Sequence, residues 1–418
     1  MIHILHTADL HLGKIIFEHS LISDQKHVIN QLLELACTKD SETGGFLYTA
    51  LIVSGDIYDR SIPTPEAVEL FDDFLTVLHR NHRELQIFII PGNHDSAQRL
   101  SYASRILKNQ NIHIDTSLSD IGTYTILEKG SEKLAVFQIP FLTPSFFEDA
   151  HKTGNQAMKS QSEILISVMK TIRSTCMEIQ TELPLPCIAS AHLFTLGAQP
   201  SDSERTFLGT AELVNTEVFD PFTFTALGHI HKPQKAGERV YYSGSPLAYS
   251  FSEAGIEKTF LHISVDCNQL TYRDGLPPLA AVEVSKIPVM PVHRASRLSG
   301  SFIEFYNDTK FDEYKDDYLE ITFTDASLIE NPMQLLKTKF PFLLSINQSE
   351  ALNRGALSSS SISEGRKTAL SGNKSLQDIF KTFVQDLYKE EESIQIINEL
   401  LPSFIEAAKE AQEGERSV

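Results

Sequence analysis

Residues 86–95 read QIFIIPGNHD, an apolar run that stops at a turn carrying polar side chains. The run at 86–90 is short and rich in β-branched and aromatic residues, which predicts a buried strand. A proline and a glycine end it, and Asn93 and His94 follow directly. Open α/β sheets place their sites just beyond the carboxyl ends of strands, so this stretch predicts functional groups at such an edge.

Four other apolar runs are followed by metal-ligating residues in the same way. The five runs together supply carboxylate, amide and imidazole groups, a mixed oxygen and nitrogen set that suits two first-row divalent metals. A structural zinc site would instead favour Cys. The other four runs, each with its polar block, are 2–7 with Asp9-Leu10-His11, 46–54 with Gly55-Asp56-Ile57-Tyr58-Asp59, 186–191 with Ala191-His192, and 222–227 with Gly228-His229-Ile230-His231.

Each block has an ordinary interpretation when it is taken alone. Asn and Asp favour turns, so Gly-Asn-His-Asp by itself could be only a turn. A lone histidine such as His192 is more often a satisfied core or surface residue than a ligand. Five blocks with complementary ligand types, all after predicted strands, are hard to assemble by chance. Two metals held close together are the standard device for the attack of water on a phosphate ester.

The ordered series of blocks resembles the calcineurin-like metallophosphoesterases. Within that superfamily the chain is similar to the bacterial branch of the nucleases that repair DNA double-strand breaks. This resemblance covers roughly residues 1–275 and weakens toward the C-terminus. The closer likeness rests on further stretches, namely residues 4–14, 92–96, 139–142, 227–231 and 242–246.

The resemblance implies two divalent metal ions, Mn²⁺ or alternatively Mg²⁺, and a role for each block. His94 is implied to be the catalytic residue beside the scissile phosphate, where it assists the leaving oxygen. Asp95 is expected to orient a neighbouring ligand or turn, and the role of Asp59 stays open. The implied ligands of the first metal are Asp9, His11 and His231. Those of the second metal are Asn93, His192 and His229, and Asp56 is implied to bind both metals.

Alternating strand and helix patterns predict a mixed α/β fold. Helical periodicity is found at 25–37, 65–82 and 158–181, whereas 123–139 and 239–265 indicate antiparallel strands, the latter ending in a turn at Asp266-Cys267-Asn268. Parallel and antiparallel strands in one domain suggest two packed sheets. The resemblance implies a four-layer α/β/β/α sandwich with a small α+β capping domain and C-terminal helices.

A chain of 418 residues is too long for one ordinary core, so several domains are expected. Within the capping domain, 302–306, 319–324 and 342–347 are predicted as strands and 328–339 as a helix. The predicted divisions are a nuclease domain at 1–275, the capping domain at 276–348, a flexible serine-rich linker at 349–374 and a helical partner-binding segment at 375–412.

The composition limits where the protein acts and on what. No apolar stretch approaches the roughly 20 residues that span a membrane, and the four cysteines form no Cys-x-x-Cys pair, so a cytoplasmic protein is expected. The net charge of −19 is unusual for a DNA-binding protein. It favours the alternative function, a small-molecule phosphomonoesterase or cyclic-nucleotide phosphodiesterase with the same dimetal core.

The resemblance also implies partners. They are DNA, cut as double-stranded ends by exonuclease action and as single strands or hairpins by endonuclease action, and a coiled-coil ATPase subunit of the SbcC type. The chain has no Gly-x-x-x-x-Gly-Lys-Ser/Thr motif, so ATP hydrolysis would come from that partner. A homodimer within a heterotetramer is expected. Apolar residues at helical spacing in 376–387 and 394–408 predict two amphipathic helices, either packed on their own domain or docked in a groove of the ATPase.

Overall fold

The structure is a computed structural model, and it describes residues 1–117, 121–142, 161–182, 184–199 and 213–348 together with Ile397 and Leu401. The chain divides into two compact units, and the first contains all of residues 1–298. Within the described ranges, no helix has both the length and the apolar character needed to cross a lipid bilayer. The predicted linker at 349–374 and nearly all of the predicted helical segment at 375–412 lie outside the described residues.

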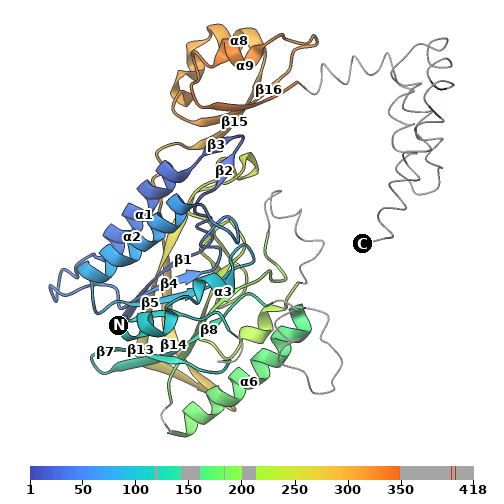
Figure 1. Cartoon of the computed structure of the whole chain (residues 1–418). Helices are drawn as coiled ribbons and strands as arrows, with labels where there is room; N and C mark the ends of the chain where they lie inside the picture. Colours follow the sequence, from blue (N-terminus) through green and yellow to red (C-terminus); the bar gives the residue numbers. More distant parts are fainter. Residues whose placement is uncertain are drawn as a thin grey trace. The chain divides into compact units, whose positions relative to one another are not determined.

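The first sheet has six strands in the order β14-β13-β1-β4-β5-β6 (Figure 1). β1, β4, β5 and β6 run parallel to one another, and β13 pairs antiparallel with both β1 and β14. Parallel strands buried on both faces favour continuous apolar runs, which is what the sequence has here. The strands are β1 (Ile2–Thr7), β4 (Ala50–Ser54), β5 (Gln86–Ile90), β6 (Ile112–Ile114), β13 (Thr259–Arg273) and β14 (Leu276–Pro288).

The second sheet also has six strands, in the order β11-β12-β10-β9-β8-β7. β8, β9, β10 and β12 are parallel, while the edge strands β7 and β11 pair antiparallel with β8 and β12. The hairpin of β7 and β8 turns at Gly130 and Ser131, since Lys129 pairs with Glu132. The strands are β7 (Thr125–Lys129), β8 (Glu132–Ile139), β9 (Cys187–His192), β10 (Phe224–Gly228), β11 (Gln234–Lys235) and β12 (Val240–Tyr242).

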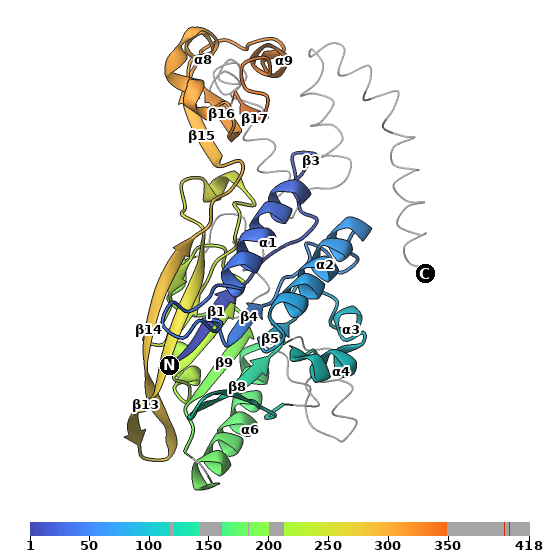
Figure 2. The same ribbon diagram turned by 90° about the vertical axis from the view of Figure 1, so that its left-hand side faces the viewer.

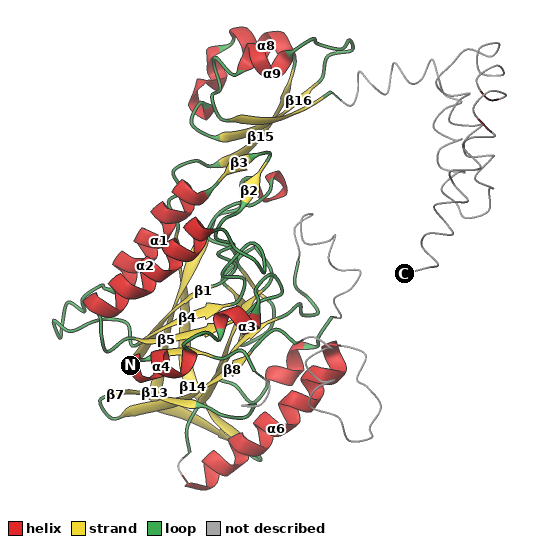
Figure 3. Cartoon of the chain, in the orientation of Figure 1, coloured by secondary structure: helices red, strands yellow, loops and turns green. Residues whose placement is uncertain are grey.

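Three apolar cores hold the layers together. One lies between the first sheet and the helices α1 (Ile22–Ala36) and α2 (Pro65–Asn81), a second lies between the two sheets, and a third lies between the second sheet and α6 (Gln161–Glu182). Figures 1 and 3 show α1 and α2 side by side on one side of the strands and α6 on the other. The predicted four-layer α/β/β/α sandwich is therefore confirmed.

Shorter elements join these layers. They follow turns rather than long apolar runs, which is why the sequence gives little sign of them. They are β2 (Ile15–Ile16), β3 (His19–Ser20), α3 (Ala97–Leu100), α4 (Ser104–Leu107) and the 3₁₀ helices η1 (Lys108–Gln110), η3 (Thr216–Phe219), η4 (Phe251–Glu253) and η5 (Thr309–Tyr314).

The turn predicted at 266–268 is wrong. β13 runs on to Arg273 and the hairpin turns at Gly275, which has a φ of 68°. Residues 266–268 instead form a bulge, because the register of β13 with β14 shifts after Asp266, whose carboxylate accepts the Asn268 N–H at 3.0 Å. Figure 2 shows β13 and β14 running alongside each other. The first sheet thus continues past the boundary predicted at residue 275.

The residues after β14 form a small three-stranded sheet, β15-β16-β17, with two short helices. The strand predicted at 302–306 is wrong, because this segment is helix α8. Ser301 and Glu304 form a capping box that satisfies the first N–H groups of the helix, and this local signal outweighs the apolar content. The elements are β15 (Ala295–Gly300), α8 (Phe302–Asn307), β16 (Tyr318–Phe323), α9 (Pro332–Leu336) and β17 (Leu343–Asn347).

Substitutions at two neighbouring residues of α6 test the apolar core between this helix and the second sheet. Leu165 is fully buried against the second sheet, whereas Ile166 is 48% exposed. Leu165→Ala should lower the free energy of unfolding by about 2–5 kcal/mol because it leaves a cavity, and Ile166→Ala should change it by less than about 0.5 kcal/mol. Denaturant unfolding of both variants measures the difference, and equal losses would contradict this packing of α6.

Candidate metal centre

The seven predicted ligands converge at one end of the two sheets. Each lies at or just beyond the C-terminal end of a parallel strand, and parallel neighbours bring those ends to the same edge. Packing of the two sheets then brings the two edges together. The supplying strands are β1 for Asp9 and His11, β4 for Asp56, β5 for Asn93, β9 for His192, and β10 for His229 and His231.

The ligands form two groups. In the first, a carboxylate oxygen of Asp9 and ring nitrogens of His11 and His231 all lie within 4.8 Å of one another, and the two Nε2 atoms are 3.1 Å apart. In the second, Asn93 Oδ1 lies 3.0 Å from His192 Nε2 and 3.0 Å from His229 Nδ1. The family resemblance implies the same two groups, and the structure also brings Asp9, Asp56 and His192 together across them.

Asp56 lies between the two groups. Its Oδ2 is 3.7 Å from His11 Nε2 in the first group and 3.4 Å from His192 Nε2 in the second. Its other oxygen, Oδ1, accepts the backbone N–H of His94 at 2.9 Å. One carboxylate oxygen therefore faces both groups, which is the position that a bridging ligand needs.

The donor atoms fit divalent metal ions. Bonds of about 2.0–2.2 Å place neighbouring ligand atoms roughly 3–3.5 Å apart, close to the separations found here. The Asp9 and Asp56 side chains are almost completely buried. Burial raises the pKa of Asp9 to about 7 despite the lowering effect of His192 and His231. A cation between these groups would offset the cost of burying two carboxylates so close together.

Residues 2–172 match the family model described as calcineurin-like phosphoesterase. The match spans fewer than half of the 418 residues, so the chain is similar to this family over its N-terminal part. The match contains the ligands up to Asn93, and the structure adds His192, His229 and His231 from beyond it. The ligand groups described above are the kind that hold divalent metals.

Solved structures of similar proteins include the calcineurin-like phosphoesterase YfkN from Bacillus subtilis. It is 14% identical, with a TM-score of 0.36, over 69% of this chain and 90% of that chain. A hypothetical protein from Pyrococcus horikoshii OT3 is 10% identical, with a TM-score of 0.28, over 69% of this chain and 89% of that chain.

The candidate metal centre is held in a strained backbone. Asp9, His11, Asp56 and His229 have φ angles of 54°, 43°, 50° and 103°, in the left-handed region where a side chain costs about 1–2 kcal/mol per residue. Backbone hydrogen bonds hold two of them, from Asp9 N to the Gly55 carbonyl and from His11 N to the Asp56 carbonyl. Such strain gathers at functional sites, where the surrounding structure imposes it.

Two glycines let the strand ends approach each other. A Cβ at Gly92 would overlap the Asp56 carboxylate, and a Cβ at Gly228 would overlap the Ser54 carbonyl. Both positions therefore require a residue without a side chain. This is the physical reason for a glycine before Asn93 and before His229.

His94 lies beside the ligands. Its Nδ1 is 2.9 Å from the Asp59 carbonyl oxygen, and its ring centroid is 4.8 Å from that of His11. Donation from Nδ1 to a carbonyl fixes the ring and assigns any proton exchange with a substrate to Nε2. The Asp59 carboxylate pairs with Lys14 at 2.7 Å and lies 3.7 Å from His11 Nδ1, so it neighbours a ligand.

Asp95 joins the two loops that carry Asp56 and Asn93. Its carboxylate accepts N–H groups of Ile57, Tyr58 and Gly92 at 3.0, 2.9 and 2.9 Å. These three bonds fix one loop against the other. Asp95 thus holds the turns that position ligands, which agrees with the role expected for it above.

Two residues that support the site had no signal in the sequence. Glu253 Oε1 lies 3.1 Å from His231 Nδ1, and its other oxygen accepts from the Lys258 ammonium. Burial alone would raise the pKa of Glu253, but Lys258 and His231 hold it well below the ordinary value. A carboxylate on the far nitrogen of a histidine ligand orients the ring and strengthens its bond to metal. Neither residue belongs to a block with recognisable spacing.

Glu253→Gln tests that support. We expect the affinity of the first metal site for Mn²⁺ to fall about 10- to 100-fold, because His231 loses its charged partner. Glu257→Gln, four residues along and exposed, is the matched control and should bind like the wild type. Calorimetric titration measures both, with thermal unfolding to show that each variant is folded. Unchanged affinity in folded Glu253→Gln would contradict the role.

Proposed function

We propose that the chain is a metal-dependent DNA nuclease that uses two Mn²⁺ ions, with Mg²⁺ as the alternative metal. The observation that carries the proposal is the meeting of seven ligands with His94 beside them. The sequence adds the resemblance to SbcD, the nuclease subunit of the bacterial SbcCD complex. In that class the enzyme shortens double-stranded ends and cuts single strands or hairpins, and it acts in DNA repair, recombination and replication.

The chain's own residues would act in three ways. Bound metals supply positive charge to the phosphate and lower the pKa of the attacking water. Asp56 holds the two groups at a fixed separation, because one oxygen faces both while the other accepts the His94 N–H. His94, held through Nδ1 by the Asp59 carbonyl, gives a proton or hydrogen bond to the leaving 3′ oxygen.

The net charge of −19 favours one competing function, hydrolysis of a small phosphomonoester or cyclic nucleotide. Both functions use the same metal core, so the substrate must decide between them. The decisive assay offers the purified chain, with Mn²⁺, a labelled hairpin DNA and p-nitrophenyl phosphate side by side. If the chain is a nuclease, it should cut the hairpin. Hydrolysis of p-nitrophenyl phosphate without cleavage of the hairpin would contradict the nuclease proposal.

His94→Ala should keep both metals and lose most hairpin cleavage. Loss of one such acid–base group costs about 10²- to 10⁴-fold in rate. The alanine variant keeps the backbone N–H that donates to Asp56, so the bridge should survive. His79→Ala, on the surface helix α2, is the control and should cleave like the wild type. Metal content is measured by plasma emission, and a His94→Ala protein with fewer metals would overturn the assignment.

The partners form part of the same proposal. We expect a homodimer that joins an SbcC-type ATPase in a heterotetramer, because the resemblance implies it and the chain lacks a P-loop of its own. The expected docking element is the segment at 375–412, whose apolar residues recur at helical spacing. Residues 349–374, rich in serine and glycine, suit a tether to that element.

Truncation after residue 350 tests the docking element. The shortened chain should still fold, bind metals and cleave at a basal rate, because all seven ligands lie before that point. It should no longer co-purify with the ATPase subunit, whereas the full chain should. A stable complex formed without residues 351–418 would show that the ATPase binds elsewhere.

A further inference from the structure

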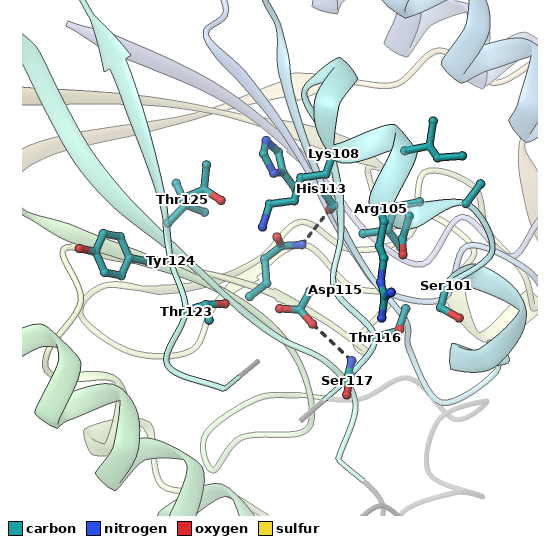
Figure 4. Close-up of a pocket in the computed structure, with 16 residues that line it drawn as sticks. Ser101, Arg105, Lys108, His113, Asp115, Thr116, Ser117, Thr123, Tyr124 and Thr125 are labelled. Atoms are coloured by element: carbon teal, nitrogen blue, oxygen red, sulfur yellow. Dashed lines mark hydrogen bonds between the residues drawn. The ribbon is translucent and has the colours of Figure 1, made fainter. Parts of the chain in front are cut away.

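A cavity of about 770 Å³ opens at the edge of the sandwich, and none of the proposed metal ligands lines it. Helix α4, η1 and strand β6 form one wall, and residues 123–125 at the start of β7 form the other (Figure 4). β6 ends the first sheet and β7 ends the second, so the cavity lies where both sheets stop. No role in the metal centre requires it.

The charge of this cavity is opposite to that of the chain. Arg105 and Lys108 line it, and Asp115 is the one acidic residue among those that do. Within the described part of the chain, neither Arg105 nor Lys108 makes a salt bridge or a side-chain hydrogen bond. In Figure 4 both side chains extend from α4 and η1 toward the cavity. Two exposed cations without partners are notable in a protein with a net charge of −19.

The rest of the lining suits an anion. Hydroxyl groups come from both walls, including Ser101, Thr116 and Thr123. Burial, with a further contribution from the nearby Lys108 charge, lowers the pKa of His113 to about 4, so this ring adds no positive charge. Hydroxyls and guanidinium or ammonium groups are the donors that phosphate oxygens accept from.

The cavity lies beside the metal centre along the same sheet edge. Asp115 follows β6 directly, and its N–H donates to the Ile89 carbonyl of β5 at 3.1 Å. Asn93 follows that same strand β5. Neighbouring strands lie about 4.8 Å apart, so this wall of the cavity is one strand away from a metal ligand. A nucleic-acid strand leaving the centre toward β6 would meet it within a few nucleotides.

We propose that this cavity binds phosphate groups of the nucleic-acid strand that flanks the scissile phosphodiester, through Arg105 and Lys108. The proposal rests on the nuclease function proposed above and names where that substrate is held. In this cavity two positively charged side chains would meet the phosphates of the strand, although the chain as a whole is acidic. A free nucleotide would offer the same phosphate groups to the cavity. The experiment below distinguishes it from a nucleic-acid strand.

The test measures binding of a fluorescein-labelled single-stranded oligothymidylate to the full chain by anisotropy, with EDTA present to prevent cleavage. The double variant Arg105→Glu/Lys108→Glu should bind at least about tenfold more weakly. The slope of log affinity against log salt concentration should also become less steep, by about 0.7 for each phosphate contact that is lost. Binding equal to that of the wild type would overturn the proposal.

The matched control is Lys170→Glu/Arg173→Glu on α6. Both residues are exposed and outside the cavity, and the change in total charge is the same. An equal loss in this control would mean that only overall charge matters, and it would also overturn the proposal. Metal content, measured in the presence of Mn²⁺ for both variants, shows that the centre is intact.

Competition separates the two phosphate sources. Thymidine monophosphate should displace the oligonucleotide only weakly, since a strand places several phosphates at once. If the mononucleotide binds as tightly, and this binding depends on Arg105 and Lys108, the cavity serves a free nucleotide and the proposal is wrong. Failure of the nuclease function looks different, because the wild type would then bind the strand and leave the hairpin uncut.

Discussion

The site depends on the burial of two carboxylates, Asp9 and Asp56, where the two sheets meet. An ionised carboxylate in a protein interior is costly unless cations or hydrogen bonds compensate it. Here the compensation comes from histidines on both sheets, and His192 lies within 4.0 Å of Asp9 and 3.4 Å of Asp56. The Asp9 carboxylate also accepts the His229 N–H at 2.9 Å. The site therefore forms only when the two sheets pack together, because neither sheet alone supplies enough partners for the two carboxylates.

Buried hydrogen bonds beneath the ligands also hold the two sheets together. The Ser54 hydroxyl lies 3.0 Å from His6 Nε2 and 3.0 Å from the Ser190 hydroxyl, and it donates to the Ala226 carbonyl at 3.2 Å. The bonds to Ser190 and Ala226 cross from the first sheet to the second. The Ser54 carbonyl also accepts from His192 Nδ1 at 2.8 Å, which turns Nε2 toward Asn93 and Asp56. Since a slip of one residue would turn every side chain over, polar bonds at this depth fix the register on which the ligand positions depend.

The parts of the fold that could be predicted from sequence are those encoded locally. Apolar runs that end at a ligand indicate both a strand and the sheet edge where it ends, so a mixed α/β fold with the ligands at one edge could be expected. The four-layer sandwich and the division of the ligands between two metals were implied by the family resemblance instead. Glu253 could not be expected, because its meeting with His231 arises from a loop path that no spacing encodes. The α8 segment was predicted wrongly because its apolar residues suit a strand, while the Ser301 capping box selects a helix. The hairpin turn was misplaced because Asp266, a good turn residue, forms a bulge instead.

The acidity of the chain bears on how the site finds its substrate. Electrostatic attraction depends on the local field, and exposed charges farther than about 8–10 Å are largely screened at physiological salt. Acidic residues such as Glu320 and Asp317 pair with arginines of the small three-stranded sheet rather than with the metal ligands. Near the ligands, Lys14 and Arg60 both face Asp59. This leaves Arg105 and Lys108 without acidic partners among the described residues, at an edge one strand from the centre. The net charge of the chain is therefore a poor guide to this edge, where Arg105 and Lys108 outnumber the one acidic lining residue, Asp115.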